Sequence, residues 1–272
     1  MMSKIILVTG ASSGLGAATA QALAEAGHIA YAGVCAASGR RPIATEPDGD
    51  AGRQGARPRP IALDVADQRS VSAAVTGITA QAGRIDCVVH TMGPVPRGPV
   101  ESFTPYQLAQ IYDANVLSTQ RVNRAVLPQM RERRDGLLVW VVSHADPADE
   151  APYLALHSES VAVIDHLAAS YAKELAGFGV EATVVVAGLT VPETGRRLRL
   201  VLPDDLGTAQ AYEGRYPGLV DRVDAHLAGR AVTAARPGRT AQAVAAVVDS
   251  PKGARPPRVT AGEPAGRPPG NR

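Results

Sequence analysis

Thr9-Gly10-Ala11-Ser12-Ser13-Gly14-Leu15-Gly16 joins a short apolar run, Ile5–Val8, to an Ala-rich segment of helical character, Leu15–Ala26. Three glycines at a strand-to-helix junction let the backbone turn tightly and approach a pyrophosphate, whose charge is then held by the N–H groups and the dipole of the helix N-terminus. The Gly-x3-Gly-x-Gly spacing is weak as a pattern alone, so its place between strand and helix carries the argument. The stretch therefore indicates a dinucleotide-binding turn rather than an ordinary glycine-rich connection.

Short apolar runs of strand length alternate with longer segments of helical period along the rest of the chain. Unbroken apolar runs are typical of strands that are buried on both faces of a parallel sheet. The predicted strands are Ile5–Val8, Ile29–Val34, Ile61–Leu63, Ile85–Val89, Leu137–Val142, Val180–Val186 and Arg258–Thr260. The predicted crossover helices are Leu15–Ala26, Val71–Ala82, Tyr106–Met130, Tyr153–Ala176 and Ala241–Val248. This alternation predicts a single α/β domain with a doubly wound, Rossmann-like parallel sheet.

Three segments depart from this rhythm. We expect residues 1–250 to form the dinucleotide-binding domain, and residues 251–272 to hold the last strand and a disordered tail. Residues 38–60 are rich in Arg, Pro, Gly and Asp and predict a mobile loop. Residues 190–234 follow the sixth predicted strand, where ligands of open α/β sheets bind, so they predict a small helical lid over the substrate. A helical decoration packed on the sheet edge is the alternative.

Bulk composition disfavours several classes of protein. The net charge of +2 comes from 28 basic and 26 acidic residues that form no basic stripe, so no nucleic-acid partner is expected. Two cysteines, Cys35 and Cys87, give no disulfide framework. No apolar segment approaches the roughly 20 residues that span a bilayer, and the N-terminus runs directly into the first strand. We therefore expect a soluble cytoplasmic protein that does not bind membranes.

Four further motifs stand at particular places in the predicted sheet. Leu63-Asp64-Val65 follows the third strand, His90-Thr91-Met92-Gly93 the fourth, Asn115 lies within a long helix, and Val186-Ala187-Gly188-Leu189-Thr190 ends the sixth strand. With the glycine turn, these motifs resemble the short-chain dehydrogenase/reductase family over nearly the whole chain. The resemblance implies the same doubly wound fold. It also implies a homodimer or homotetramer that pairs through the two long helices, and a small carbonyl-bearing molecule as the substrate.

The resemblance also assigns a cofactor site. The residues that it places against the cofactor are Gly10, Ser12, Ser13, Gly14, Leu15, Gly16, Asp64, Val65, Gly93 and Thr190. In the family, an acidic residue at the end of the second strand holds the ribose of NAD, and here that place falls near Gly33. The missing acid favours NADP(H). Arg40 and Arg41 could reach the additional phosphate, or they are two solvated charges of the loop.

The family's catalytic Ser, Tyr and Lys are absent. The family sets Tyr and Lys four residues apart on one helix face, so that the ammonium lowers the pKa of the phenol. Counting back from Ala172–Gly179, which resembles the end of that helix, puts His157 and Val161 in these places. The catalytic Ser lies thirteen residues before the Tyr, a place that His144 takes here, directly after Ser143. Of the four catalytic positions, Asn115 alone is kept.

A second register would put Tyr153 in the place of the family Tyr and His157 in that of the Lys. It requires one additional helical turn before Ala172 and a shortened loop, two compensating changes. In the first register, Tyr153 lies about a turn upstream of His157 and lines the substrate pocket.

Two imidazoles at reacting positions suggest acid/base chemistry. His144 and His157 would point into one pocket, where each could act as general acid or base, and mutual repulsion would keep at least one of them neutral. A metal site is disfavoured, because only Glu159 or Asp146 could add a ligand. Ser143 to Asp146 form no hydrolase triad, because neighbours on a strand point to opposite faces.

Three functions remain open. The first is a redox-neutral cyclisation, isomerisation or dehydration of a carbonyl-bearing, polyketide-like natural-product intermediate, with His144 and His157 as proton carriers and NADP(H) bound without being consumed. The second is an NADPH-dependent ketoreductase in which cationic His157 protonates the developing alkoxide while His144 or Asn115 hydrogen-bonds it. The third is a non-catalytic protein that binds nucleotide. The suggested substrate rests on family analogy alone.

Overall fold

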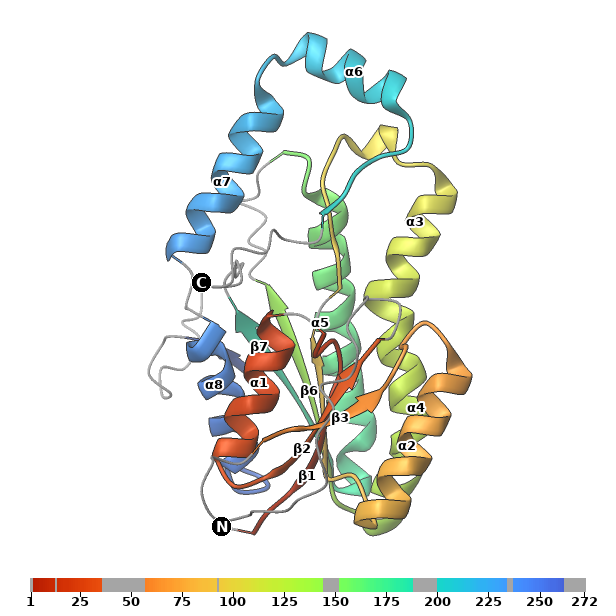
Figure 1. Cartoon of the computed structure of the whole chain (residues 1–272), viewed down its shortest axis with the longest axis vertical. Coiled ribbons are helices and arrows are strands. Elements are labelled where there is room, and N and C mark those ends of the chain that lie inside the picture. The colour runs from red at the N-terminus through yellow and green to blue at the C-terminus, as the bar shows by residue number, and fades with distance from the viewer. Residues whose placement is uncertain are drawn as a thin grey trace.

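The computed structural model describes residues 2–12, 14–35, 57–91, 93–143, 152–187, 200–233 and 237–261. These residues form a parallel sheet of seven strands in the order β3-β2-β1-β4-β6-β7-β9, flanked by helices (Figure 1). The strands are β1 Ile5–Val8, β2 Ile29–Val34, β3 Arg59–Ala62, β4 Cys87–Thr91, β6 Gly136–Ser143, β7 Val180–Ala187 and β9 Arg258–Thr260. The predicted doubly wound sheet in a single domain is confirmed.

Helices cover both faces of the sheet. The helices of the main body are α1 Gly14–Glu25, α2 Gln68–Ala82, α3 Pro105–Tyr112, α4 Ser118–Arg133, α5 Ala155–Leu175 and α8 Pro237–Asp249. On one face α2, α4 and α5 bury a core that includes Trp140, Met130 and Ile164. On the other face α1 and α8 bury a second core that includes Leu23 and Val244. The apolar strands therefore have no water-facing side, which is why their sequences run unbroken.

Several predicted elements have limits that differ by a few residues from the observed ones, and the clearest differences are in β4 and in the long central helix. The strand predicted over Ile85–Val89 runs from Cys87 to Thr91, and the N–H of Ile85 donates instead to the side chain of Gln129 at 3.1 Å. The helix predicted over Tyr106–Met130 is interrupted by a π-helical turn, η3, over Asp113–Leu117. Such turns occur most often at functional sites, and this one contains Asn115.

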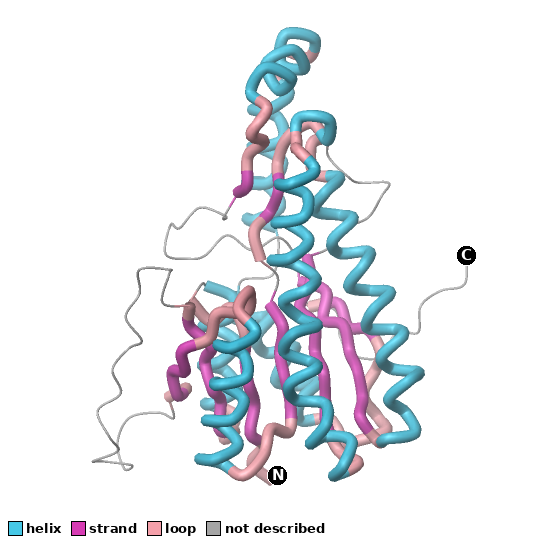
Figure 2. Tube along the Cα trace, turned by 90° about the vertical axis from the view of Figure 1, so that its right-hand side faces the viewer, coloured by secondary structure: helices cyan, strands magenta, loops and turns pink. Residues whose placement is uncertain are grey.

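A lid segment, residues 200–233, rises beyond the carboxyl ends of the strands. It contains β8 Leu200–Val201, α6 Leu206–Arg215 and α7 Leu219–Thr233. Its strand β8 pairs in parallel with β5, Val95–Pro96, which follows β4. Figure 2 shows the lid segment standing above the body of helices and sheet. The substrate-covering role expected for this part of the chain stays a prediction.

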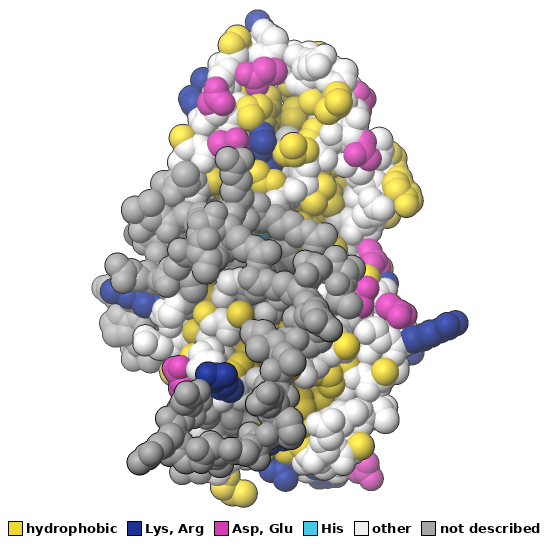
Figure 3. Space-filling view, viewed as in Figure 1, with side chains coloured by type: hydrophobic (Ala, Val, Ile, Leu, Met, Phe, Trp, Pro, Cys, Tyr) yellow, Lys and Arg dark blue, Asp and Glu magenta, His cyan; other side chains and the backbone are white. Residues whose placement is uncertain are grey.

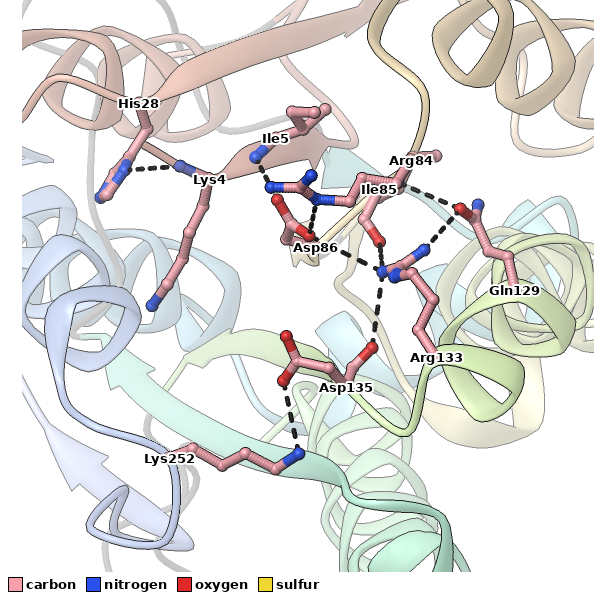
Figure 4. A network of polar contacts seen from close by, with 10 residues as sticks. All are labelled: Lys4, Ile5, His28, Arg84, Ile85, Asp86, Gln129, Arg133, Asp135 and Lys252. Atoms are coloured by element: carbon pink, nitrogen blue, oxygen red, sulfur yellow. Dashed lines mark hydrogen bonds and ion pairs between the residues drawn. The ribbon is translucent and has the colours of Figure 1, made fainter. Parts of the chain in front are cut away.

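The opposite, amino edge of the sheet is tied by ion pairs and hydrogen bonds (Figure 4). The Asp86 carboxylate accepts from the N–H of Ile5 at 2.8 Å and from Arg84 Nε at 2.7 Å, and Arg133 lies 3.7 Å away. On the far side of β1, His28 accepts from the N–H of Lys4 at 3.3 Å. These contacts join strands and helices at the edge that is remote from the lid segment.

Candidate active site

The glycine turn between β1 and α1 is closed too tightly for side chains. Gly10 has φ +66°, and a Cβ added there would lie 2.3 Å from Thr91 Oγ1. A Cβ added to Gly16 would lie 2.5 Å from the carbonyl oxygen of Gly10. Helix α1 begins at Gly14, its first turn carries no acidic residue, and Leu15 packs partly against the core. The turn thus presents a helix N-terminus without opposing charge, an arrangement that fits a nucleotide pyrophosphate.

The end of β2 lies directly beside this turn. Ser12 Oγ accepts from the N–H of Cys35 at 3.0 Å, and the N–H of Ala11 donates to the carbonyl of Gly33 at 3.0 Å. A Cβ added to Gly33 would lie 2.6 Å from Leu63 Cδ2 and 3.0 Å from the carbonyl oxygen of Val8, so a side chain there would require a neighbour to shift. The sites predicted at Ser13, Thr190, Arg40 and Arg41 lie outside the described residues.

Asp64 and Val65 form the rim beyond β3. The Asp64 carboxylate accepts from the N–H of Ala66 at 3.0 Å, and the backbone N–H of Asp64 donates to Ser70 Oγ at 2.9 Å. The carbonyl of Val65 accepts from Arg121 at 3.5 Å. Local bonds therefore fix both residues at the carboxyl edge, in the place where the family resemblance expects an adenine.

Asn115 lies in the π-helical turn and is almost fully buried. Its Nδ2 donates to the carbonyl of Pro94 at 3.3 Å and to Ser160 Oγ at 3.4 Å. A Cβ added to Gly93 would lie 2.6 Å from Asn115 Oδ1, which explains the glycine after β4. Among the described residues Asn115 Oδ1 has no hydrogen-bond partner. Asn115 thus ties the turn after β4 to helix α5.

The last residue of β6 meets the first turn of α5. Ser143 Oγ lies 2.5 Å from His157 Nε2, and His157 is 4% exposed. Burial lowers the pKa of His157 to about 4, so its imidazole is neutral near pH 7. No described residue bonds its Nδ1. A hydroxyl and a neutral imidazole in contact form a pair through which a proton can move.

The other residues of the predicted catalytic set lie elsewhere. Val161 is buried in the core beneath the sheet, one turn after His157. Tyr153 precedes α5 and packs against apolar side chains of the lid segment. The side chain beside Ser143 is therefore the imidazole of His157 and not the phenol of Tyr153. His144 lies outside the described residues, so its predicted meeting with His157 stays a prediction.

The sequence analysis did not predict Ser143 as the partner of His157. The count of thirteen residues pointed to His144, whereas the observed hydroxyl partner stands 14 residues before His157. Ser143 could have been recognised from its position, because it ends a parallel strand at the edge of the sheet where ligands bind.

The described residues contain no group of three or more His, Cys, Asp or Glu that could hold a metal ion. None of their helices is both long enough and apolar enough to cross a bilayer.

Known proteins resemble the chain in sequence. The family model for short chain dehydrogenases matches residues 4–200. A putative ketoacyl reductase of the monensin polyketide synthase, from Streptomyces virginiae, is 31% identical over 237 residues, which are 83% of each protein. The 3-ketodihydrosphingosine reductase of Bacteroides thetaiotaomicron is 30% identical over 188 residues, 69% of this chain. The match spans 64% of that reductase and 66% of a short chain dehydrogenase of Pseudocercospora fijiensis.

Solved structures resemble the chain in fold. A short-chain dehydrogenase from Streptomyces avermitilis superposes with a TM-score of 0.73 at 26% identity, over 97% of this chain and 89% of that one. An actinorhodin polyketide ketoreductase variant with NADPH gives 0.69 at 18% identity over 95% of each chain, a likeness of fold alone. The family match, the strand order and the glycine turn agree, and the chain belongs to the short-chain dehydrogenase family.

Proposed function

We propose that this chain is an enzyme in which His157, oriented by Ser143, acts as a general base on a carbonyl-bearing, polyketide-like intermediate. The step is redox-neutral: a cyclisation, an isomerisation or a dehydration. The contact of 2.5 Å between Ser143 Oγ and His157 Nε2 carries the proposal. The putative ketoacyl reductase of the monensin polyketide synthase, which is 31% identical to this chain, supports the substrate class.

The buried ring supports the role of base over that of acid. With a pKa of about 4, the cationic form of His157 costs about 4 kcal/mol at pH 7. A neutral imidazole can instead accept a proton from carbon beside the substrate carbonyl. Negative charge that develops on the carbonyl oxygen would then raise the pKa of the neighbouring imidazole and favour the transfer. Ser143 fixes the direction in which the ring faces.

The loss of the lysine supports the same proposal. Val161 brings no charge beside His157, so nothing there resembles the ammonium that activates a phenol in the family. Asn115 is already engaged with Pro94 and Ser160 and acts as a positioning residue. Among the described residues, the proton carriers of the proposed site are the hydroxyl of Ser143 and the imidazole of His157. His144 lies outside the described residues.

The cofactor that we propose is NADP(H). Gly10, Gly14 and Gly16 would hold its pyrophosphate, Asp64 and Val65 would face its adenine, and Gly33 stands where the family has the acid that selects NAD. When bound, the nicotinamide supplies a hydride donor or acceptor. In the proposed reaction it would be bound without being consumed. We further propose that the enzyme is cytoplasmic; the family resemblance suggests a homodimer or homotetramer.

One alternative has support of its own, the NADPH-dependent reduction of a ketone. The intact glycine turn and the 31% identity to a ketoacyl reductase favour it. It needs His157 as a cation that donates a proton, so its rate should rise as the pH falls from 7 toward 4. The general-base reaction predicts the opposite, because protonation removes the base.

Purified protein incubated with NADPH and a panel of aromatic and polyketide ketones separates these functions. We expect product without loss of NADPH absorbance. His157→Ala should lower kcat by about 10²–10⁴-fold, and Ser143→Ala should lower it less, because the base remains. His166→Ala, on an exposed position of α5, is the matched control and should change nothing.

Three outcomes contradict the proposal. NADPH oxidation in step with alcohol formation would establish the reductase. Unchanged turnover in both site variants would remove His157 from the chemistry. NADPH binding without any product from the panel would indicate a non-catalytic nucleotide-binding protein.

A further inference from the structure

Tyr153 lies where the lid segment meets the body of the protein, four residues before His157. It packs in an apolar cluster whose buried members are Val95, Leu154, Val223 and Leu227, with Leu200 and Leu219 beside them. These residues come from β5, the entrance to α5, β8 and α7. Figure 3 shows apolar side chains gathered over the lid half of the molecule. Tyr153 thus borders a packed apolar contact between the lid segment and the body of the protein.

Two polar atoms in this region lack partners among the described residues. The Tyr153 hydroxyl is buried and bonds none of them, and the same holds for Glu213 Oε2. The other carboxylate oxygen, Oε1, accepts from the N–H of Gly218 at 2.7 Å and so fixes Glu213. A buried group without a partner costs about 1–3 kcal/mol. One of these atoms donates and the other accepts, which is the complement of a ligand hydroxyl group.

The phenol stays protonated at neutral pH. Burial raises the pKa of Tyr153, and the negative charge of Glu213 raises it further. Glu213 is held to Gly218, and the next residue, Leu219, packs in the same apolar cluster as Tyr153. Tyr153 is therefore a hydrogen-bond donor, and Glu213 is an acceptor.

The backbone of Tyr153 is strained as well. Its φ is +70°, a conformation that bulky residues rarely adopt and that costs about 1–3 kcal/mol. The N–H of Gly98 donates to the Tyr153 carbonyl at 3.0 Å and holds it there. Strain and an unpaired hydroxyl thus meet in one residue. Such a combination persists where it serves binding or catalysis.

We propose that Tyr153 and Glu213 select the substrate: they bind hydroxyl groups on an aromatic or polycyclic ketone whose rings lie against the apolar cluster under the lid segment. The Tyr153 hydroxyl donates to a ligand oxygen, and the Glu213 carboxylate accepts from a ligand O–H. This inference rests on the proposed function, which sets the ketone carbonyl at His157. It adds that the substrate carries hydroxyl groups away from the reacting carbonyl.

A matched pair of ketones tests the inference: 1-tetralone and 6-hydroxy-1-tetralone, titrated into the NADPH-loaded protein by calorimetry. The wild-type protein should bind the hydroxylated ketone more tightly. Tyr153→Phe, which removes one oxygen atom, should weaken the hydroxylated ketone by about tenfold to a hundredfold and leave the plain ketone unchanged. Glu213→Gln should act in the same direction. Tyr106→Phe, at an exposed position of α3, is the matched control.

A stability measurement separates this role from a merely structural one. Since Tyr153→Phe removes an unpaired buried hydroxyl, the free variant should unfold at the wild-type Tm or above it. A lower Tm, an equal loss of affinity for both ketones, no loss for either, or no binding of the hydroxylated ketone to the wild type would overturn the inference. Because these readouts are binding and stability, they stay valid in the His157→Ala variant. Failure here is therefore distinct from failure of the general-base reaction.

Discussion

Among the histidines that the structure describes, burial changes the pKa of His157 and of His90 most clearly. Burial lowers the pKa of each to about 4, and for His90 the hydrogen bond to Asn123 Oδ1 at 2.8 Å only partly opposes this effect. The His90 ring also stacks on Trp140, with the ring centroids 5.3 Å apart. In the unfolded chain both imidazoles return to an ordinary pKa near 6.5. Protons therefore bind the unfolded chain more strongly than the folded protein between these two values.

This difference predicts a loss of stability in mild acid. Above pH 6.5 the two histidines cause no loss of stability. The free energy of unfolding falls as the pH drops from 6.5 toward 4, because the unfolded state takes up the protons. Each histidine should contribute about 3 kcal/mol to the loss. Urea unfolding at a series of pH values measures it. His157→Gln should flatten the profile by one histidine's share, whereas the exposed His166→Gln should leave it unchanged; equal slopes in all three proteins would contradict the assigned burial effect.

The sequence reveals some of these residues more readily than others. Counting back from Ala172–Gly179, which resembles the end of the family's helix, predicts His157 at the reacting position. Ser143 is harder to place, because a loop without periodicity separates it from α5 and any change in loop length shifts the count. Tyr153 could be placed near the lid segment, but its positive φ and its unpaired hydroxyl depend on tertiary contacts that no local pattern encodes.

At the level of elements, Gln107 of α3 connects the body to the lid segment. Its Nε2 donates to the carbonyl of Leu202 at 3.0 Å, and its Oε1 accepts from the N–H of Asp204 at 2.8 Å. The side chain is buried, and both of its polar ends are satisfied by backbone. Beyond β8, the side-chain amide of Gln107 thus continues the hydrogen bonding to the lid segment that begins with the pairing of β5 and β8.

Gln107→Leu should loosen the lid segment. The substitution leaves two backbone groups without partners, at a cost of about 1–3 kcal/mol. We expect hydrogen exchange over residues 202–215 to quicken by about tenfold or more, while exchange in β1 and β4 stays as it was. Gln110→Leu, exposed on the same helix, is the control. Uniformly faster exchange in both variants would show that Gln107 has no special role.

Some strands were predicted with the limits that the structure shows. The observed limits of β1, β2 and β9 agree with those predicted from the sequence. The break in the long helix at Asp113–Leu117 could not be predicted, because nothing local requires it. It coincides with the contacts of Asn115 to Pro94 and Ser160, which the fold creates.

At the level of the whole molecule, Asp86 anchors the amino edge of the sheet. It is nearly buried and accepts from the backbone of β1 as well as from Arg84. Asp86→Ala should therefore destabilise the fold by about 1–3 kcal/mol in urea unfolding, since it leaves the buried N–H of Ile5 without its acceptor. Asp135→Ala removes an exposed carboxylate from the same edge and should cost less than about 1 kcal/mol.

The activity of Asp86→Ala should match the wild type per folded molecule, because this edge lies at the other end of the strands from His157. A large change in kcat with little change in stability would contradict that separation. It would show that the amino edge positions the site.

The distance between the Asp86 anchor and the Ser143–His157 contact has an evolutionary consequence. Substitutions at Ser143 or His157 leave the ion pairs of Asp86 untouched, because the two sets of contacts share no residue. Residues at one rim of the sheet can therefore vary while those at the other are held by selection.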